Sequence, residues 1–552
     1  MRKIVQSVAW ASSVAMVAAP ALALPGDFKS RADAILAEAF AADGPGAIAV
    51  VVEKGKPVYA AGRGLADIES KRPLDPAKPM RLGSITKQFT AAMVLKLVDE
   101  GKVALDDPLS KYLPDFPKPG ADATIRQLLN HTSGIRSYTS IPGLLQARAA
   151  TPHTTAEMIA LFKDAPPTFE RGSDWAYNNS GYVLLGAVIE KVTGEPWHVA
   201  IDQQMLKPLG LKSIRYGGLK GGEADVPVGY SRAGDKVVVS NRIDMSIPHA
   251  AGSLVGSATE VAAWGRALHQ GKVIKPATYA QMITPTTLPS GRTVPYGFGL
   301  TPGDVRGRPS VGHDGGIFGF STDGIYLPSE DIYVAVFANS DEPSTDPEVL
   351  TRKLAAAAIG DPYETFSAQP VDPKAVEPLL GIYRTGDVER RFFLRDGALF
   401  TQRSGNPPMA VKPGGGNRFF YPDSLSWFEI ARSAEGKPVM RFHTNGETKA
   451  SDVAYAGPIP PEAPPASVAR ADLERLAGTY QGPVPIVVAV NPAGVLTLKF
   501  GDQPVTHLVP ESATTFRVKE VDARITFGLN DGKSTGLIIT QGGRDLAAKR
   551  AD

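Results

Sequence analysis

A serine and a lysine three residues apart are the first side chains in this sequence that could do chemistry together. Ser84 follows Gly83 and precedes Lys87, at the start of an apolar stretch from Phe89 to Val98. Apolar residues on almost every side predict a helix buried in a large core. Ser84 would lie at the N-terminus of this helix, with the Lys87 amine on the same face. Because burial favours the uncharged amine, the pair predicts a nucleophile with its own base.

The same spacing also fits a serine that caps a helix, followed one turn later by a solvated lysine. A second motif favours the catalytic interpretation. Tyr177 and Asn179 precede another apolar helix. A phenol close to a lysine can exist partly as phenolate, or it can relay a proton to a leaving group, and the Asn179 amide can bind a substrate carbonyl. The alternative for Tyr177 is a loop tyrosine that packs its ring against the core.

A third motif, His313-Asp314-Gly315-Gly316, lies just before or in a predicted strand. Its two glycines would let a substrate lie alongside the backbone. The alternative is a hairpin turn, since Asp-Gly is a common turn pair. The buried helix and the order of the three motifs along the chain favour a catalytic site.

In this order, Gly-Ser-x-x-Lys, Tyr-x-Asn and His-x-Gly resemble the serine β-lactamase and penicillin-binding-protein superfamily. The resemblance is closest to its class C-like branch, which includes D-aminopeptidases, alkaline D-peptidases, esterases and DD-carboxypeptidases. Residues 128–135 and 182–186 also resemble framework segments of that branch, and the resemblance covers about residues 28–360.

This resemblance implies a role for each motif residue. Ser84 would be the nucleophile that becomes acylated, and Lys87 and Tyr177 would share the proton transfers, with the acylation base left open between them. Asn179 would orient the substrate amide. The substrate would also contact His313 and Gly315, and the oxyanion hole would consist of the backbone N–H groups of Ser84 and Gly316.

One position departs from the β-lactamase pattern. His313 stands where those enzymes carry the lysine of Lys-Thr-Gly, which binds the substrate carboxylate. A histidine with a pKa of roughly 6.5 is mostly neutral at pH 7 and binds carboxylate weakly. The substitution argues against an efficient β-lactamase and favours substrates without a carboxylate beside the scissile bond. Another histidine, His131, is expected to cap or bridge loops.

The N-terminus predicts export. Arg2 and Lys3 precede an apolar run that ends in Ala21-Leu22-Ala23, a small-x-small cleavage signal. Residues 1–23 are therefore expected to be a signal peptide and the protein to be periplasmic or secreted, with no membrane attachment after cleavage. The chain has 59 Lys and Arg against 57 Asp and Glu, so removal of the two cations leaves a formally neutral protein. This balance gives no support for a nucleic-acid partner.

Composition also limits which catalytic groups and metal sites the chain can contain. The chain contains no cysteine, which excludes a thiol nucleophile and thiolate metal sites. None of the eight histidines falls in a His-Glu-x-x-His pattern. We therefore expect neither a metal nor another cofactor.

The 552 residues predict several domains. Residues 24–360 read as one α/β (α+β) domain with a largely antiparallel sheet flanked by helices. After a linker, 361–376, alternating strands predict a small antiparallel β-barrel over 377–456. A proline-rich linker, 457–469, precedes a second barrel over 470–552.

The two barrels are expected to be copies of one module. Leu379 to Tyr383 matches Leu476 to Tyr480, and in each copy another glycine recurs at the same later spacing. The pair resembles the lipocalin-like modules that follow the catalytic domain in D-aminopeptidases. That resemblance implies that a loop of residues 470–552 restricts the active site. The alternative is a packing or cell-wall-binding appendage.

The sequence therefore predicts an exported serine hydrolase, with a peptidase or amidase of small peptides, similar to the D-aminopeptidases, as the first expectation. The same site would also serve a carboxylesterase, or a weak β-lactamase or DD-carboxypeptidase. A protein that binds cell wall or another ligand without catalysis is the remaining alternative. The oligomeric state is left open.

Overall fold

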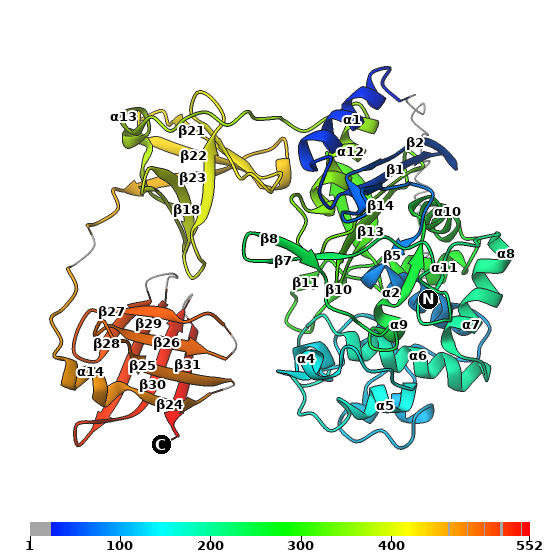
Figure 1. Cartoon of the computed structure of the whole chain (residues 1–552), viewed down its shortest axis with the longest axis horizontal. Coiled ribbons are helices and arrows are strands. Elements are labelled where there is room, and N and C mark those ends of the chain that lie inside the picture. The colour runs from blue at the N-terminus through cyan, green and yellow to red at the C-terminus, as the bar shows by residue number, and fades with distance from the viewer. Residues whose placement is uncertain are drawn as a thin grey trace, which may run out of the picture. The chain divides into compact units, whose positions relative to one another are not determined.

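The computed structural model describes residues 24–461, 464–482, 484–501, 503–518, 523–541 and 544–551. The chain forms two compact units, Met1–Tyr363 and Glu364–Asp552 (Figure 1). The expected signal peptide, residues 1–23, lies outside the described residues and stays a prediction. In the part that is described, no helix combines the length and apolar character needed to cross a membrane.

The first unit contains a six-stranded sheet in which every pair of neighbours is antiparallel. This confirms the expected sheet, since its strands come from both ends of the unit. In sheet order they are β12 (Thr301–Val305), β13 (Arg308–Ile317), β14 (Phe320–Leu327), β15 (Ile332–Ala338), β1 (Ala47–Glu53) and β2 (Lys56–Arg63).

Helices cover both faces of this sheet. Every residue of β15 is buried, which requires cover on each side. Helices α1 (Phe28–Ala39) and α12 (Pro347–Ala358) pack together over the sheet, and α10 (Ala258–His269) packs against β1, β14 and β15 (Figure 1). The first unit is therefore an α/β domain of the expected kind.

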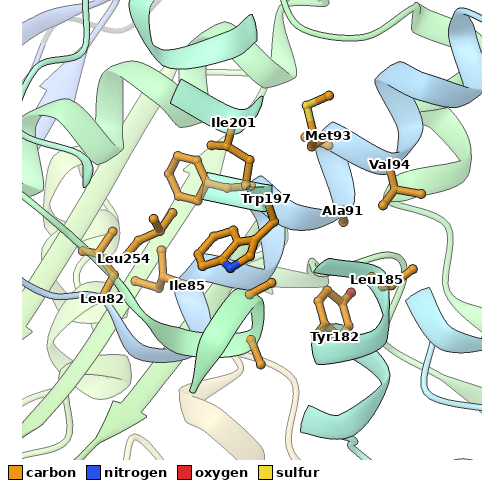
Figure 2. Packing of buried hydrophobic residues seen from close by; sticks show 14 of the residues in the cluster. Leu82, Ile85, Ala91, Met93, Val94, Tyr182, Leu185, Trp197, Ile201 and Leu254 are labelled. Atoms are coloured by element: carbon orange, nitrogen blue, oxygen red, sulfur yellow. The ribbon is translucent and has the colours of Figure 1, made fainter. Parts of the chain in front are cut away.

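The helix that follows the candidate nucleophile is α2 (Thr86–Asp99), and all residues from Thr86 to Leu95 are buried, as the sequence predicted. It packs against α6 (Asn179–Thr193), α7 (Trp197–Ile201) and α9 (His249–Gly252). The core around these helices includes the side chains of Ala91, Met93, Tyr182, Leu185 and Trp197 (Figure 2).

Short elements complete the first unit. The helices are α3 (Ile125–Leu129), α4 (Leu144–Arg148), α5 (Thr155–Ala160), α8 (Lys207–Leu209) and α11 (Pro276–Met282). Strands β5 (Met80–Arg81), β9 (Leu254–Gly256) and β6 (Arg215–Tyr216) form a three-stranded sheet beside the start of α2. Two-stranded sheets pair β3 (Leu65–Asp67) with β4 (Arg72–Pro73), β7 (Tyr230–Ala233) with β8 (Lys236–Val239), and β10 (Thr286–Thr287) with β11 (Thr293–Val294).

The second unit contains two closed eight-stranded antiparallel barrels, which confirms the expected architecture. The first barrel consists of β16 (Gly381–Thr385), β17 (Val388–Arg395), β18 (Ala398–Arg403), β19 (Met409–Pro413), β20 (Arg418–Phe420), β21 (Trp427–Arg432), β22 (Pro438–His443) and β23 (Ser451–Gly457). The second consists of β24 (Gly478–Gln481), β25 (Pro485–Val490), β26 (Leu496–Phe500), β27 (Thr506–Pro510), β28 (Thr515–Val518), β29 (Ala523–Asn530), β30 (Lys533–Gln541) and β31 (Arg544–Arg550). Short helices α13 (Pro373–Val376) and α14 (Arg470–Leu476) precede them.

The two barrels share one anchoring contact, which explains the repeated sequence pattern. The fully buried Tyr383 donates its hydroxyl hydrogen to the Leu379 carbonyl over 2.6 Å. Tyr480, also fully buried, makes the same bond to Leu476 over 2.6 Å. Each tyrosine thus fixes the segment that leads into the first strand of its barrel.

Replacing Phe89 by Ala is expected to destabilise the first unit by about 3–5 kcal/mol, because it leaves a cavity in the core. The Phe89 ring stacks on Trp264 with ring centroids 4.3 Å apart, and both residues are fully buried. Urea unfolding of the full chain, followed by tryptophan fluorescence, measures the change. The control Leu219→Ala removes a side chain that is 48% exposed and should shift stability by less than about 1 kcal/mol. Equal effects of the two variants would contradict this account of the core.

Candidate active site

Ser84 lies in a short 3-10 turn, Gly83–Ile85, that leads directly into α2. The sequence predicted Ser84 at the start of an α-helix, and the structure inserts this tighter turn first. Gly83 adopts φ +52°, a left-handed conformation that favours glycine. A Cβ at Gly83 would lie 3.0 Å from the Gly316 nitrogen, so glycine also permits the close approach of β13. Ser84 itself remains partly exposed.

The Lys87 amine lies at the centre of the site. Its Nζ is 3.1 Å from Ser84 Oγ, 2.7 Å from Asn179 Oδ1 and 2.9 Å from the Ala251 carbonyl oxygen. The two carbonyl oxygens can only accept hydrogen bonds, so they take two of the amine hydrogens. In the neutral amine, the lone pair is then left to face the Ser84 hydroxyl.

Burial decides the protonation of this amine. Lys87 is fully buried, and desolvation lowers its pKa to about 7, with the Asp314 carboxylate acting in the opposite direction. None of the described acidic side chains forms an ion pair with it within 4 Å. At neutral pH a large fraction of Lys87 is therefore uncharged and able to accept a proton.

Tyr177 lies in the loop before α6, with the Lys87 Nζ 4.6 Å from its ring centroid. Although 37% of Tyr177 is exposed, desolvation raises the pKa of its phenol well above the usual value, opposed by a hydrogen bond with Ser84. A phenol with a raised pKa carries its proton at neutral pH. The structure therefore favours proton donation over the phenolate form that the sequence left open.

His131 contacts the loop that carries Tyr177 through a hydrogen bond and a ring contact. Its Nδ1 accepts a hydrogen bond from the Asn178 N–H over 3.2 Å, and its ring centroid is 4.6 Å from that of Tyr177. Burial lowers the pKa of His131 well below its usual value, so the ring is neutral. The structure gives His131 the loop-bridging contact expected from the sequence.

Asn179 is the first residue of α6 and is fixed by two neighbours. Its Nδ2 donates to Thr139 Oγ1 over 3.2 Å, and its backbone N–H donates to Ser137 Oγ over 3.2 Å. Because Nδ2 is bound in this way, Oδ1 faces Lys87. The structure thus brings Asn179 to the amine.

The end of β13 presents an open edge beside Ser84. Strand β12 pairs with β13 only as far as Gly312, which leaves residues 313–317 without a strand partner on that side among the described strands. Ile317 pairs with Phe320 across a two-residue turn, and hydrogen-bonded pairs alternate along antiparallel strands. Gly316 therefore directs its N–H away from β14, toward the Ser84 turn.

The N–H groups of Ser84 and Gly316 can thus point at one substrate oxygen, which is the geometry of an oxyanion hole. A Cβ at Gly316 would have no protein atom within 4 Å, so the space in front of it is open. At Gly315, by contrast, a Cβ would lie 2.2 Å from the Leu82 carbonyl oxygen. Gly315 is therefore needed for the strand to approach the turn.

His313 is nearly fully buried, with 2% of its surface exposed, and both ring nitrogens have partners within the protein. Nδ1 donates to the Asp314 carbonyl oxygen over 2.5 Å, and Nε2 accepts the hydroxyl hydrogen of Tyr296 over 2.9 Å. Desolvation lowers the pKa of His313, so the ring is neutral. The structure places it beside the site without a free nitrogen for substrate.

Sequence reasoning missed two partners in this site. Ala251 contributes only its carbonyl oxygen, which no side-chain pattern reveals, and the small residues of α9 were the one available signal. Tyr296 is an isolated tyrosine whose contact with His313 depends on the fold. Among the described residues, no group of three or more His, Asp or Glu side chains is placed to hold a metal ion.

Comparisons with known proteins identify the family of the first unit. A sequence model of the Beta-lactamase family matches residues 32–359. A D-aminopeptidase of Gluconobacter oxydans is 27% identical over 58% of this chain and 60% of its own length. Esterase EstB of Burkholderia gladioli is 32% identical over 38% of this chain and 56% of its own length. The chain thus spans about three fifths of the length of each of these two relatives. A solved structure of a D-stereospecific amidohydrolase from Streptomyces superposes with a TM-score of 0.52 and 30% identity, over 60% of this chain and 98% of the other.

The hydrolytic rate should fall with decreasing pH through a pKa of about 7, because protonation of Lys87 removes the lone pair that faces Ser84. Below that pKa the decrease should approach about tenfold per pH unit. The rate of Ser84 acylation by an uncharged acylating probe, measured from pH 5 to 9, tests this directly. A rate that stays flat between pH 5 and 8 would exclude Lys87 as the base.

Gly315→Ala should slow Ser84 acylation on the order of 100-fold, because a Cβ 2.2 Å from Leu82 O displaces β13 from the nucleophile. The control Gly44→Ala adds its Cβ to open space outside the site, at a glycine without a left-handed φ, and should leave acylation by a small probe unchanged. Burst kinetics with a chromogenic acyl ester compare the two. If both variants acylate at the parental rate, the proposed approach of β13 is wrong.

Proposed function

Because this chain belongs to the Beta-lactamase family, we propose that it is a serine peptidase or amidase of small peptides that forms an acyl-enzyme on Ser84. The observation that carries the proposal is the buried Lys87 amine 3.1 Å from Ser84 Oγ, with its pKa lowered to about 7. A neutral amine in that position is a competent general base for a serine hydroxyl.

In the proposed mechanism, Ser84 Oγ attacks the scissile carbonyl while the neutral Lys87 accepts the hydroxyl proton. The carbonyl oxygen takes up negative charge between the N–H groups of Ser84 and Gly316. As the bond to the leaving group breaks, Tyr177 donates its proton to that group and regains one from Lys87. Water then attacks the acyl ester by the reverse sequence and regenerates Ser84.

The charge of the site favours D-aminopeptidase-like or amidase chemistry over β-lactam hydrolysis. His313 is neutral and its nitrogens are occupied, so the site offers no cation at that position for a substrate carboxylate. The similarity to a D-aminopeptidase and to a D-stereospecific amidohydrolase supports amide substrates and D-residues. We further propose that residues 1–23 direct export to the periplasm or the exterior.

A carboxylesterase is the second candidate. Esterase EstB is 32% identical over 38% of this chain, and the same nucleophile, base and oxyanion hole would cleave an ester. An ester needs less help for its leaving group than an amide, so loss of the Tyr177 proton should matter less for ester substrates.

Ser84→Ala should abolish hydrolysis, with a loss of about 1000-fold or more in kcat, across a panel of D- and L-aminoacyl amides, short acyl esters and a chromogenic β-lactam. In the parent protein we expect D-aminoacyl amides to give the highest kcat/KM. The matched control Ser30→Ala, an exposed position on α1, should keep full activity. Turnover retained in Ser84→Ala would refute the mechanism, and a β-lactam as the best substrate would refute the assignment of substrate.

A further inference from the structure

One carboxylate at the active site takes no part in the mechanism above. Asp314 lies on β13 between His313 and Gly315, in the segment of the strand that has no partner on the side of Ser84 among the described strands. Its side chain is 72% exposed. Among the described residues, the basic side chain within 4 Å of this carboxylate is His313, whose Nδ1 is 3.7 Å from Asp314 Oδ1, and that ring is neutral. The carboxylate is therefore not neutralised by any described lysine or arginine in contact with it.

The contacts of His313 place this carboxylate near the proton donor. The His313 ring, which the Asp314 carboxylate approaches, has its centroid 6.1 Å from that of Tyr177. Lys87 Nζ lies a further 4.6 Å from the Tyr177 ring. In agreement with this arrangement, the negative charge of Asp314 raises the pKa values of both Lys87 and Tyr177.

We propose that Asp314 selects substrates by the charge of the leaving group, excluding a leaving group that carries a carboxylate and favouring one that is uncharged or cationic. The inference rests on the proposed function, in which Tyr177 protonates the leaving group. A group that receives its proton from Tyr177 must lie close to Tyr177, and so within range of the Asp314 charge. The substrates would be aminoacyl amides, peptide amides and amine conjugates, in preference to peptides that end in a free carboxylate one residue beyond the scissile bond.

The proposed selection acts through electrostatic repulsion between Asp314 and an anionic leaving group, and it does not require the substrate to lose a contact. An anionic leaving group would have to be desolvated beside a fixed carboxylate, with His313 unable to supply a compensating positive charge. A cationic amine in the same place would gain a favourable interaction instead. The order of preference should therefore follow the charge of the leaving group rather than its size.

The test uses three substrates with one acyl residue and leaving groups of similar length: glycine, glycinamide and ethylenediamine, which are anionic, neutral and cationic. The full chain should hydrolyse them with kcat/KM in the order cationic, neutral, anionic. Asp314→Asn should reduce the ratio of kcat/KM for glycinamide over glycine on the order of tenfold, the effect of one unit charge at short range in a partly solvated site. Asp235→Asn, which removes an exposed charge from the β7–β8 turn, should leave the ratio unchanged.

A labelling experiment separates failure of this inference from failure of the proposed function. Ser84 is treated with a neutral fluorophosphonate and with benzylpenicillin, which carries a carboxylate beside its leaving nitrogen. Asp314→Asn should increase the rate of labelling by benzylpenicillin relative to the fluorophosphonate, again by about tenfold. If neither reagent labels Ser84 in the parent protein, the proposed function fails. If both label it and the variant keeps the parental preference in the two experiments, the role of Asp314 is wrong and the proposed function stands. A further comparison uses substrates whose acyl residue carries either a free or an acylated α-amine. If Asp314→Asn changes the preference between these two and leaves the leaving-group ratio unchanged, Asp314 lies on the acyl side and the inference is wrong.

Discussion

The burial of one lysine amine without a carboxylate partner is the constraint on which the site depends. Removing an ammonium from water is unfavourable, and no described carboxylate pairs with this one. Burial therefore favours the neutral amine and lowers the pKa of Lys87 to about 7. The amine is held by a side-chain amide from α6 and a backbone carbonyl from α9. Those two helices must therefore pack closely on α2, which explains why α2 is buried on nearly every side.

The close approach of the sheet to this helix depends on two glycines, which carry no side chain. Gly83 and Gly315 lie where any Cβ would meet backbone atoms at 3.0 Å or less. Their absence lets the edge of β13 lie against the 3-10 turn, so that two backbone N–H groups converge. In the proposed mechanism, the helical core supplies the nucleophile and its base, and the sheet supplies the site for the developing negative charge. Neither part forms an oxyanion hole alone.

What could be predicted from the sequence was local or repetitive. Ser84 and Lys87 are one helical turn apart, so their encounter follows from backbone geometry, and the match between Tyr383 and Tyr480 revealed the second barrel. Contacts between distant segments could not be predicted in the same way. The carbonyl of Ala251 has no sequence signature, and the burial of His313 against Tyr296 depends on how β13 meets a separate loop. The motif located His313 beside the site but could not show that its nitrogens were already occupied.

The site that results is almost free of fixed charge. Burial lowers the pKa values of Lys87, His131 and His313, and it raises that of Tyr177, so each of these groups is shifted toward its neutral form. In such surroundings, oriented N–H dipoles stabilise an oxyanion more effectively than they would in water. A proton can also pass between an amine and a phenol without separating charges over a long distance. This neutrality increases the influence of the exposed Asp314 carboxylate, because no described lysine or arginine forms an ion pair with it.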